Sequence, residues 1–248
     1  MYLRKHINIL KSITADYYIK IFGTAGAYSA IWNDTNLVQD SNLKSTDLAE
    51  LRLLIDKVIS ERTSNDCIYW CDKEQSDNRI FEFERFMSEA QIDKLGIDEK
   101  LREISKYLGK PTRHWFLMAN KLIFKNANVG SGGGVHRDSP FSNQIKIIWY
   151  LNDVDGANGP FTFQEGTHAR AHTQEYKLGE MRFEKMIGKR TEVTGKAGTM
   201  VICDTKCVHG GKPMTTGVRY AITLYSFSRN SKRNQELTNM RNQNQNIQ

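Results

Sequence analysis

The sequence predicts a mainly β protein with a sandwich or barrel core and helices packed outside it. Three observations predict this class. From Trp115 onward, short apolar or alternating runs are separated by turn residues. The first half of the chain instead carries apolar residues at helical spacing. A chain of 248 residues is long enough for one domain with a substantial core.

Residues 1–112 are expected to be largely helical. One helix is expected to begin at a cap provided by Asp47, because its apolar residues recur at helical spacing: Leu48, Leu51, Leu54, Ile55, Val58 and Ile59. A second helix is expected over residues 98–108, where Gly109 and Pro111 would end it. Between the two helices, Ile80 to Phe86 is interpreted as an edge strand.

Residues 113–228 are expected to form the β core of a single domain covering 1–228. Strands are predicted at 115–124, 143–151, 161–163, 199–203 and 220–227. Glycines between 130 and 134 and the Asn158-Gly159-Pro160 sequence mark turns between them. The polar segment at about 169–190 interrupts the strands like an insertion or lid. Residues 229–248 are rich in Asn and Gln, and we expect them to be disordered.

Composition limits the classes of function. No run of about 18 apolar residues exists, so no membrane span is expected, and the basic N-terminus lacks the features of a secretory signal. We therefore expect a cytoplasmic protein. The net charge of +7 is interpreted as a solubilising surface plus a basic tail, with a polyanionic partner as the alternative. The four cysteines, Cys67, Cys71, Cys203 and Cys207, are interpreted as reduced thiols, with a zinc site as the alternative.

The most informative residues are His136-Arg137-Asp138, with His209 about seventy residues later. Side chains at i and i+2 of an extended segment point to the same face, so His136 and Asp138 can present an imidazole and a carboxylate to one point. A second histidine from a neighbouring strand completes two nitrogens and one oxygen. This ligand set leaves open coordination positions and suits non-haem iron(II), whereas structural zinc usually takes four closed ligands.

Arg219 follows His209 by ten residues and opens a predicted strand. A turn at Gly210-Gly211 and Pro213 to Gly217 allows His209 and Arg219 to lie on adjacent antiparallel strands. A buried guanidinium near a metal can bind a carboxylate through two parallel hydrogen bonds, which is what a dicarboxylic keto acid needs at its far end.

Between about Asn120 and Ser228, the sequence resembles the phytanoyl-CoA dioxygenase-like family of iron(II)/2-oxoglutarate oxygenases. The motifs that carry the resemblance stand in order: Lys125 and a glycine-rich run, His136-Arg-Asp138, Trp149-Tyr-Leu-Asn-Asp-Val154, Asn158-Gly-Pro160, Gly166-Thr-His168, His209 and Arg219. The resemblance implies a double-stranded β-helix core, also called a jelly roll and cupin-like, with helices outside that come mostly from the N-terminal half.

The resemblance also implies roles for particular residues. His136, Asp138 and His209 would bind iron(II), and Arg219 would bind the far carboxylate of 2-oxoglutarate, with dioxygen as the second cosubstrate. Lys125 matches a lysine before the metal motif and is a further candidate for cofactor binding. No catalytic residue beyond the metal ligands is implied. The chain departs from many members at Gly211, where they carry a serine that assists the arginine.

Two further residues have alternative interpretations. His168 is expected to stabilise its loop by hydrogen bonding, with substrate contact as the alternative. Arg137 is interpreted as a surface residue, or as a group at the mouth of the site that favours an anionic substrate.

The resemblance favours a hydroxylase that acts on a small biosynthetic intermediate of the sugar, lipid or natural-product class. The alternatives are a non-catalytic metal-binding jelly roll and a basic scaffold for polyanions. A nucleic-acid demethylase is disfavoured, because the arginine-rich signature of that group is missing around Arg219. Desaturation and epimerisation are alternatives to hydroxylation.

Overall fold

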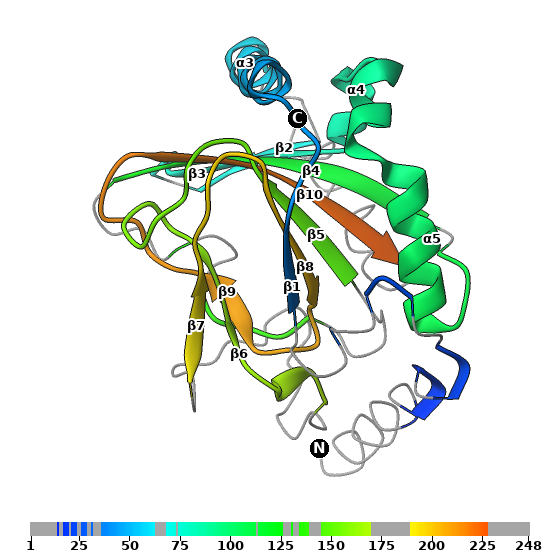
Figure 1. Cartoon of the computed structure of the whole chain (residues 1–248). Coiled ribbons are helices and arrows are strands. Elements are labelled where there is room, and N and C mark those ends of the chain that lie inside the picture. Colours follow the sequence, from blue (N-terminus) through cyan, green and yellow to red (C-terminus); the bar gives the residue numbers. More distant parts are fainter. Residues whose placement is uncertain are drawn as a thin grey trace, which may run out of the picture.

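The chain folds as two antiparallel sheets that face each other, with helices on the outside of the larger sheet (Figure 1). A computed structural model describes residues 14, 17–19, 21–23, 26–28, 31, 36–62, 68–72, 74–112, 114–125, 130, 134–138, 145–169 and 189–227. The larger sheet has seven strands in the order β1-β8-β5-β10-β4-β3-β2, and the smaller has three in the order β7-β6-β9. Neighbours far apart in sequence, such as β5 and β10, are typical of a jelly roll.

The bounds of the strands are β1 Asn36–Asp40, β2 Tyr69–Cys71, β3 Asp77–Phe81, β4 His114–Ile123, β5 Ile145–Tyr150, β6 Phe161–Gln164, β7 Arg190–Val193, β8 Thr199–Asp204, β9 His209–Gly211 and β10 Val218–Phe227. The helices are α3 Ser45–Glu61, α4 Glu89–Leu95 and α5 Ile97–Leu108, with 3-10 turns η1 Phe83–Phe86 and η2 Thr167–Ala169.

The outer face of the seven-stranded sheet packs against α3, α4 and α5 (Figure 1). Alternation along the strands sends Leu117, Trp149 and Ile222 to this face, where they join Ile55 of α3 and Ile104 of α5 in one buried cluster. Trp149 is 1% exposed. The helices therefore cover the side of the sheet that lies away from the three-stranded sheet.

The inner face carries a second apolar cluster, shared with the smaller sheet. Ile148 and Val201 contribute from the large sheet, and Phe161 and Phe163 contribute from β6. Tyr150, on the opposite face from Trp149, also joins this cluster, and its hydroxyl donates to the Val193 carbonyl at 2.9 Å. This hydrogen bond therefore links β5 of the large sheet to β7 of the small sheet.

Strand β10 lies in the middle of the large sheet and fixes its register. It pairs with β4 from Val218↔Ile123 to Phe227↔His114, and with β5 from Ala221↔Tyr150 to Tyr225↔Lys146. Because Ala221 belongs to the inner cluster, the alternating positions Arg219 and Tyr225 also face inward.

The predicted fold class, a β jelly roll with helices outside, is confirmed. The five predicted strands correspond to β4, β5, β6, β8 and β10, and the two predicted helices correspond to α3 and α5. Gly109 ends α5 in the left-handed conformation, with a φ of 64°. The first 112 residues also supply strands β1, β2 and β3 to the large sheet, which the helical interpretation of this part did not include.

Two local expectations were wrong. Asp47 is not the N-cap of α3, because the helix already begins at Ser45; its carboxylate instead accepts a hydrogen bond from the backbone N–H of Lys44 at 2.9 Å. The segment from Ile80 to Phe86 is not one edge strand. β3 ends at Phe81 and lies between β4 and β2, and Phe83–Phe86 forms a 3-10 turn.

The predicted lid and tail fall mainly outside the part of the chain that can be described. Residues 170–188 and 228–248 lie outside it, whereas Arg190 already belongs to β7. Among the residues that are described, no helix is long and apolar enough to cross a membrane.

Candidate metal centre

The backbones of His136 and His209 are joined directly. The two residues form an antiparallel β-bridge in which each N–H donates to the other's carbonyl at 2.8 Å. Their imidazole rings lie side by side, with centroids 4.4 Å apart. The sequence expectation that a neighbouring strand brings the second histidine to the first is confirmed, because His209 opens β9.

Asp138 completes the group from two residues further along the chain. Its backbone N–H donates to the Thr205 carbonyl at 2.9 Å, which fixes the segment against the loop between β8 and β9. One ligand atom from each of His136, Asp138 and His209 lies within 4.8 Å of the other two. The carboxylate oxygens are 3.8 Å from His136 Nε2 and 3.9 Å from His209 Nε2.

Main-chain carbonyls hold both imidazoles by the other ring nitrogen. Nδ1 of His136 lies 2.9 Å from the Gly134 carbonyl, and Nδ1 of His209 lies 3.0 Å from the Cys207 carbonyl. A carbonyl can only accept, so each Nδ1 carries a hydrogen, and in the neutral form of each ring Nε2 has the lone pair that binds a metal. This arrangement is the usual one for a metal-binding histidine.

The electrostatics of the group also fit a cation. Asp138 is 2% exposed and His209 is 3% exposed. Burial, followed by the neighbouring His136, holds the pKa of His209 well below its ordinary value, so the ring is neutral and able to coordinate. Its buried Nε2 has no hydrogen-bond partner among the described residues. A divalent metal would satisfy that nitrogen together with the carboxylate, so the residues present fit the ion.

Glycines allow the metal-binding segments to approach closely. Gly130 has a φ of 85°, and a Cβ at this position would lie 2.1 Å from the Gly211 carbonyl oxygen. A Cβ on Gly210 would lie 2.9 Å from the Gly134 carbonyl oxygen. Glycine at positions 130 and 210 therefore has a steric reason.

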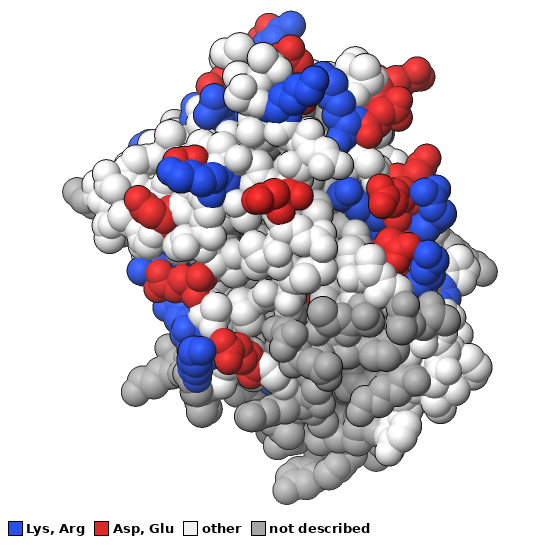
Figure 2. Space-filling view, in the orientation of Figure 1, with Lys and Arg blue, Asp and Glu red and all other residues white. Residues whose placement is uncertain are grey.

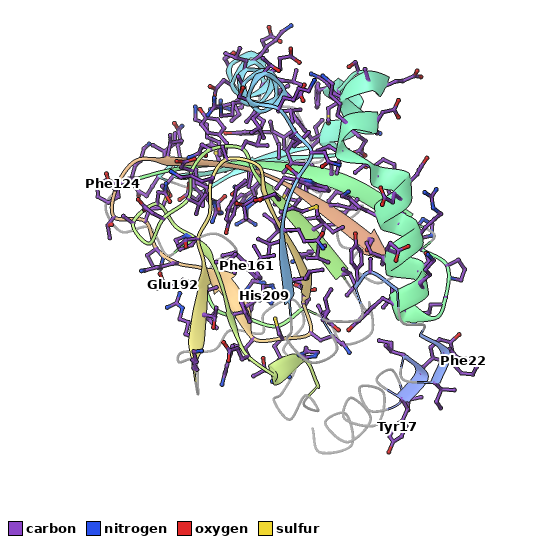
Figure 3. All side chains as sticks on the ribbon, viewed as in Figure 1. Tyr17, Phe22, Phe124, Phe161, Glu192 and His209 are labelled. Atoms are coloured by element: carbon purple, nitrogen blue, oxygen red, sulfur yellow. The ribbon has the colours of Figure 1, made fainter. Side chains whose placement is uncertain are left out.

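The surroundings of the histidines are apolar on the side of the small sheet. In Figure 3, Phe161 and His209 lie close together between the two sheets, whereas Glu192 of β7 lies on the outer side. The two rings have centroids 5.7 Å apart. An apolar neighbour of this kind lowers the local dielectric and excludes water from the ligands.

Lys146 is a site residue that the sequence analysis missed. It lies on the inner face of β5, and its Nζ is 2.6 Å from Oδ2 of Asp138. The same ammonium lies 4.7 Å from the centroid of the Tyr225 ring. The signal was present in the sequence, because Lys146 interrupts an otherwise apolar strand, Ile145-Lys-Ile-Ile-Trp-Tyr150.

Arg219 is 5% exposed and is held by two acceptors. Its Nη1 donates to the Gly159 carbonyl, and its Nη2 donates to Asn120 Oδ1 at 3.1 Å. The buried Nε has no hydrogen-bond partner within the described part of the chain. Burial lowers the pKa of the guanidinium from its usual value, with Tyr150 acting in the opposite direction.

The expected pairing of His209 and Arg219 on adjacent strands was wrong. His209 belongs to β9 of the small sheet, and Arg219 belongs to β10 of the large one. The chain crosses from one sheet to the other between them, as a sandwich with short connections requires.

Asn120 supports the arginine and was also missed. Its Nδ2 donates to Asp77 Oδ1 at 2.7 Å and to the Asn78 carbonyl at 3.1 Å, so its oxygen is turned towards Arg219. Asp77 in turn pairs with Arg79. These partners come from β3 and directly precede the residues from Ile80 to Phe86, where the sequence analysis placed an edge strand.

The structure also places the three remaining predicted site residues. Lys125 is exposed after β4, and its Nζ donates to the Glu74 carbonyl at 2.6 Å. Arg137 is half-buried between the two ligands. His168 is 4% exposed in η2, at the start of the predicted lid. Their roles in binding cofactor or substrate stay predictions.

The described cysteines are free thiols. Cys203 and Cys207 are fully buried with their sulfurs 3.7 Å apart, and burial raises the pKa of Cys207 well above its ordinary value. Cys67 lies outside the described residues. The one group of three possible metal ligands found in the described ranges contains no cysteine.

Comparison with known families gives the class of the protein. The family model described as phytanoyl-CoA dioxygenase (PhyH) matches residues 37–221. The match spans well over half of the chain, so the chain belongs to the phytanoyl-CoA dioxygenase family. No curated protein matches the chain significantly.

Solved structures support the same fold. The epimerase SnoN, crystallised with Fe3+, alpha ketoglutarate and nogalamycin RO, superposes with a TM-score of 0.62 at 16% identity, covering 80% of each chain. The carbocyclase SnoK from nogalamycin biosynthesis gives 0.55 at 16% identity, covering 87% of this chain and 83% of its own. HygX from Streptomyces hygroscopicus, with nickel and 2-oxoglutarate bound, gives 0.57 at 13% identity, covering 80% and 84%.

Proposed function

We propose that the protein is an iron(II)- and 2-oxoglutarate-dependent oxygenase that oxidises a small organic substrate. The observation that carries the proposal is the group of His136, Asp138 and His209, with one ligand atom of each within 4.8 Å of the others. Two imidazoles and one carboxylate on one side of an ion leave positions for a chelating keto acid and dioxygen.

Backbone contacts of the chain orient the side chains of this proposed ligand set. The β-bridge between the two histidines and the carbonyls of Gly134 and Cys207 fix the direction of each Nε2. A bound iron(II) would supply the redox chemistry by which dioxygen and 2-oxoglutarate give succinate and carbon dioxide while the substrate is oxidised. The protein contributes ligand geometry and an apolar surrounding.

Arg219 is proposed to bind the far carboxylate of 2-oxoglutarate. It is buried on the inner face of β10, and its Nε is without a hydrogen-bond partner in the described residues. A guanidinium that is already oriented by Asn120 loses little freedom when a carboxylate pairs with it. This part of the proposal is separable from the metal site.

A small organic molecule is the proposed substrate, and hydroxylation is the proposed reaction. The structural neighbours include SnoN in complex with nogalamycin RO and HygX with hygromycin B bound, which supports this size of substrate. SnoN and SnoK are described as an epimerase and a carbocyclase, so other outcomes of the same oxidation are alternatives to hydroxylation.

A basic scaffold for polyanions is less well supported. On the face shown in Figure 2, Lys and Arg are interspersed with Asp and Glu over α3, α4 and α5. Lys94 of α4 is paired with Asp47 at 2.5 Å, and Lys106 of α5 is paired with Glu103 at 2.6 Å. An interspersed surface creates no strong field of one sign.

The test is succinate release by the protein supplied with iron(II), 2-oxoglutarate, dioxygen and a panel of metabolite classes. We expect release above background with wild type, loss of release in Asp138→Ala and His209→Ala, and retention in His114→Ala, which removes an exposed histidine from β4. Equal turnover by wild type and Asp138→Ala contradicts the proposal. Stoichiometric metal binding without succinate formation from any class would instead indicate a non-catalytic metal protein.

A further inference from the structure

We propose that Lys146 binds a carboxylate next to the metal, at a position separate from the one that Arg219 occupies. The inference rests on the metal centre of the proposed function and deepens it, because it predicts that a second anionic group is recognised at the same site. The carboxylate can come from the metal-binding end of the keto acid or from the substrate.

The first step is the position of Lys146. It lies on the inner face of β5, opposite Tyr225 of β10, and its side chain is 8% exposed. Within the described part of the chain, its ammonium contacts the Asp138 carboxylate at 2.6 Å and the face of the Tyr225 ring at 4.7 Å. An ammonium has three N–H donors, and a carboxylate and an aromatic face leave capacity for another acceptor.

The second step is charge. Without metal, Asp138 compensates the buried Lys146. A divalent ion bound by Asp138 shares that one negative charge, so the dication and the ammonium then face each other across a single carboxylate. A buried cation that loses its counter-ion is costly, and another anion beside the ion restores the balance. A carboxylate of the keto acid or of the substrate would supply this negative charge beside Lys146.

The third step separates Lys146 from Arg219. Lys146 is paired with Tyr225, whereas Arg219 lies six residues earlier on the same strand β10. At about 3.3 Å per residue, these positions are about 20 Å apart along the strand. We therefore expect the two side chains to bind different carboxylates, with Lys146 beside the metal and Arg219 further along the strand.

The surface beside Lys146 is aromatic. Tyr225 stacks on Phe116 with centroids 4.8 Å apart and an interplanar angle of 8°, and Met118 completes this cluster. A ligand that joins a carboxylate to a flat apolar ring can pair its carboxylate with the ammonium and pack its ring against such a surface. Benzoate is accordingly the probe for the substrate source.

The experiment measures binding rather than turnover, with Mn(II)-loaded protein and isothermal titration calorimetry. The ligands are 2-oxoglutarate, 2-oxopentanoate, which lacks the far carboxylate, and benzoate added with and without 2-oxoglutarate. The variants are Lys146→Met, Lys146→Gln and Lys146→Arg. The control is Lys121→Met, because Lys121 makes the same kind of contacts on the outer face, with Asp56 at 2.6 Å and with the Tyr220 ring at 5.1 Å.

We expect Lys146→Met and Lys146→Gln to weaken binding at least tenfold, Lys146→Arg to weaken it less, and Lys121→Met to leave it unchanged. An equal loss for both keto acids assigns Lys146 to the carboxylate at the metal end of the keto acid. A loss confined to benzoate assigns it to a substrate carboxylate.

Three results overturn the inference. Unchanged affinity for all the ligands shows that Lys146 only compensates Asp138. A loss for 2-oxoglutarate without a loss for 2-oxopentanoate places Lys146 at the far carboxylate. Loss of Mn(II) binding in both neutral variants makes it a support for Asp138 alone. If wild type binds Mn(II) but no keto acid, the proposed function fails, while the benzoate measurement on the Mn(II) protein still tests Lys146.

Discussion

Each metal-binding histidine uses one ring nitrogen for the backbone and leaves the other for an ion. The acceptors of the Nδ1 hydrogens are the carbonyls of Gly134 and Cys207, at 2.9 and 3.0 Å. Both carbonyls belong to the segments that carry the ligands, two residues before each histidine. The orientation of the imidazoles is therefore a local property of the two chain segments, and the β-bridge between them sets the distance.

The lowered pKa of His209 predicts how the metal-free protein responds to acid. The unfolded chain binds a proton at about pH 6.5, the ordinary histidine value, whereas the buried ring in the folded state resists it. The contribution of His209 to the free energy of unfolding is therefore complete above about pH 6.5. Below that pH the free energy of unfolding decreases, by up to about 1.4 kcal/mol per pH unit for one such site.

Urea unfolding of the metal-free protein at pH 7.5 and 5.5 measures this effect. We expect His209→Gln to lose less stability between the two pH values than wild type, and His114→Gln to behave like wild type. The same loss in all three proteins would show that His209 titrates normally in the folded state.

Arg219 also allows a prediction at the residue scale. Lysine keeps the positive charge but lacks the planar pair of donors that a carboxylate accepts. We expect Arg219→Lys to weaken 2-oxoglutarate binding by about tenfold or more, in line with the loss of one charge-assisted hydrogen bond. Calorimetry on the Mn(II) form measures it, and an unchanged dissociation constant would remove Arg219 from the cofactor site.

At the scale of elements, helix α3 shows which face of the large sheet is structural. Ile55 is fully buried against the outer face, whereas Leu53 on the same helix is 69% exposed. We expect Ile55→Ala to lower the free energy of unfolding by about 2–5 kcal/mol, and Leu53→Ala to change it by less than about 0.5 kcal/mol. Chemical denaturation of both variants provides the measurement, and equal effects would contradict the packing described.

The approach of the glycine-rich segment to β9 gives a prediction about the site. In the Gly130→Ala variant, the positive φ destabilises the folded protein by about 1 kcal/mol or more. The new Cβ also clashes with the Gly211 carbonyl. Gly217 has a similar φ of 73° but open space around it. We expect Gly130→Ala to weaken Mn(II) binding and Gly217→Ala to leave it intact. Equal Mn(II) affinities would show that the close approach does not position the ligands.

Apolar periodicity in the sequence predicted the elements that pack one side against a single core. The long strands of the large sheet and the helices α3 and α5 have apolar residues at regular spacing, because one side of each packs in the core between the sheet and the helices. The strands β1, β2 and β7 were not predicted. They have between three and five residues, and β7 alternates without a strong apolar face. Such short strands are stabilised by their partners rather than by their own composition.

At the scale of the whole molecule, the sandwich brings together residues that no local pattern connects. Spacing predicted that His136 and Asp138 share a face, and the structure joins them to His209 through a bridge outside the named strands. Lys146 and Asn120 were missed because their roles depend on the register of β5 with β10 and of β4 with β3. Register is a property of the complete sheet, so one sequence does not reveal it.

The three ligand residues can be tested directly by anomalous diffraction at the iron edge, on crystals grown without oxygen with iron(II) and 2-oxoglutarate. We expect one strong peak bonded to Nε2 of His136, Nε2 of His209 and a carboxylate oxygen of Asp138, with the keto acid chelating the same ion. Full occupancy by iron at any other set of residues, or an ion that lacks one of these three ligands, would contradict this expectation.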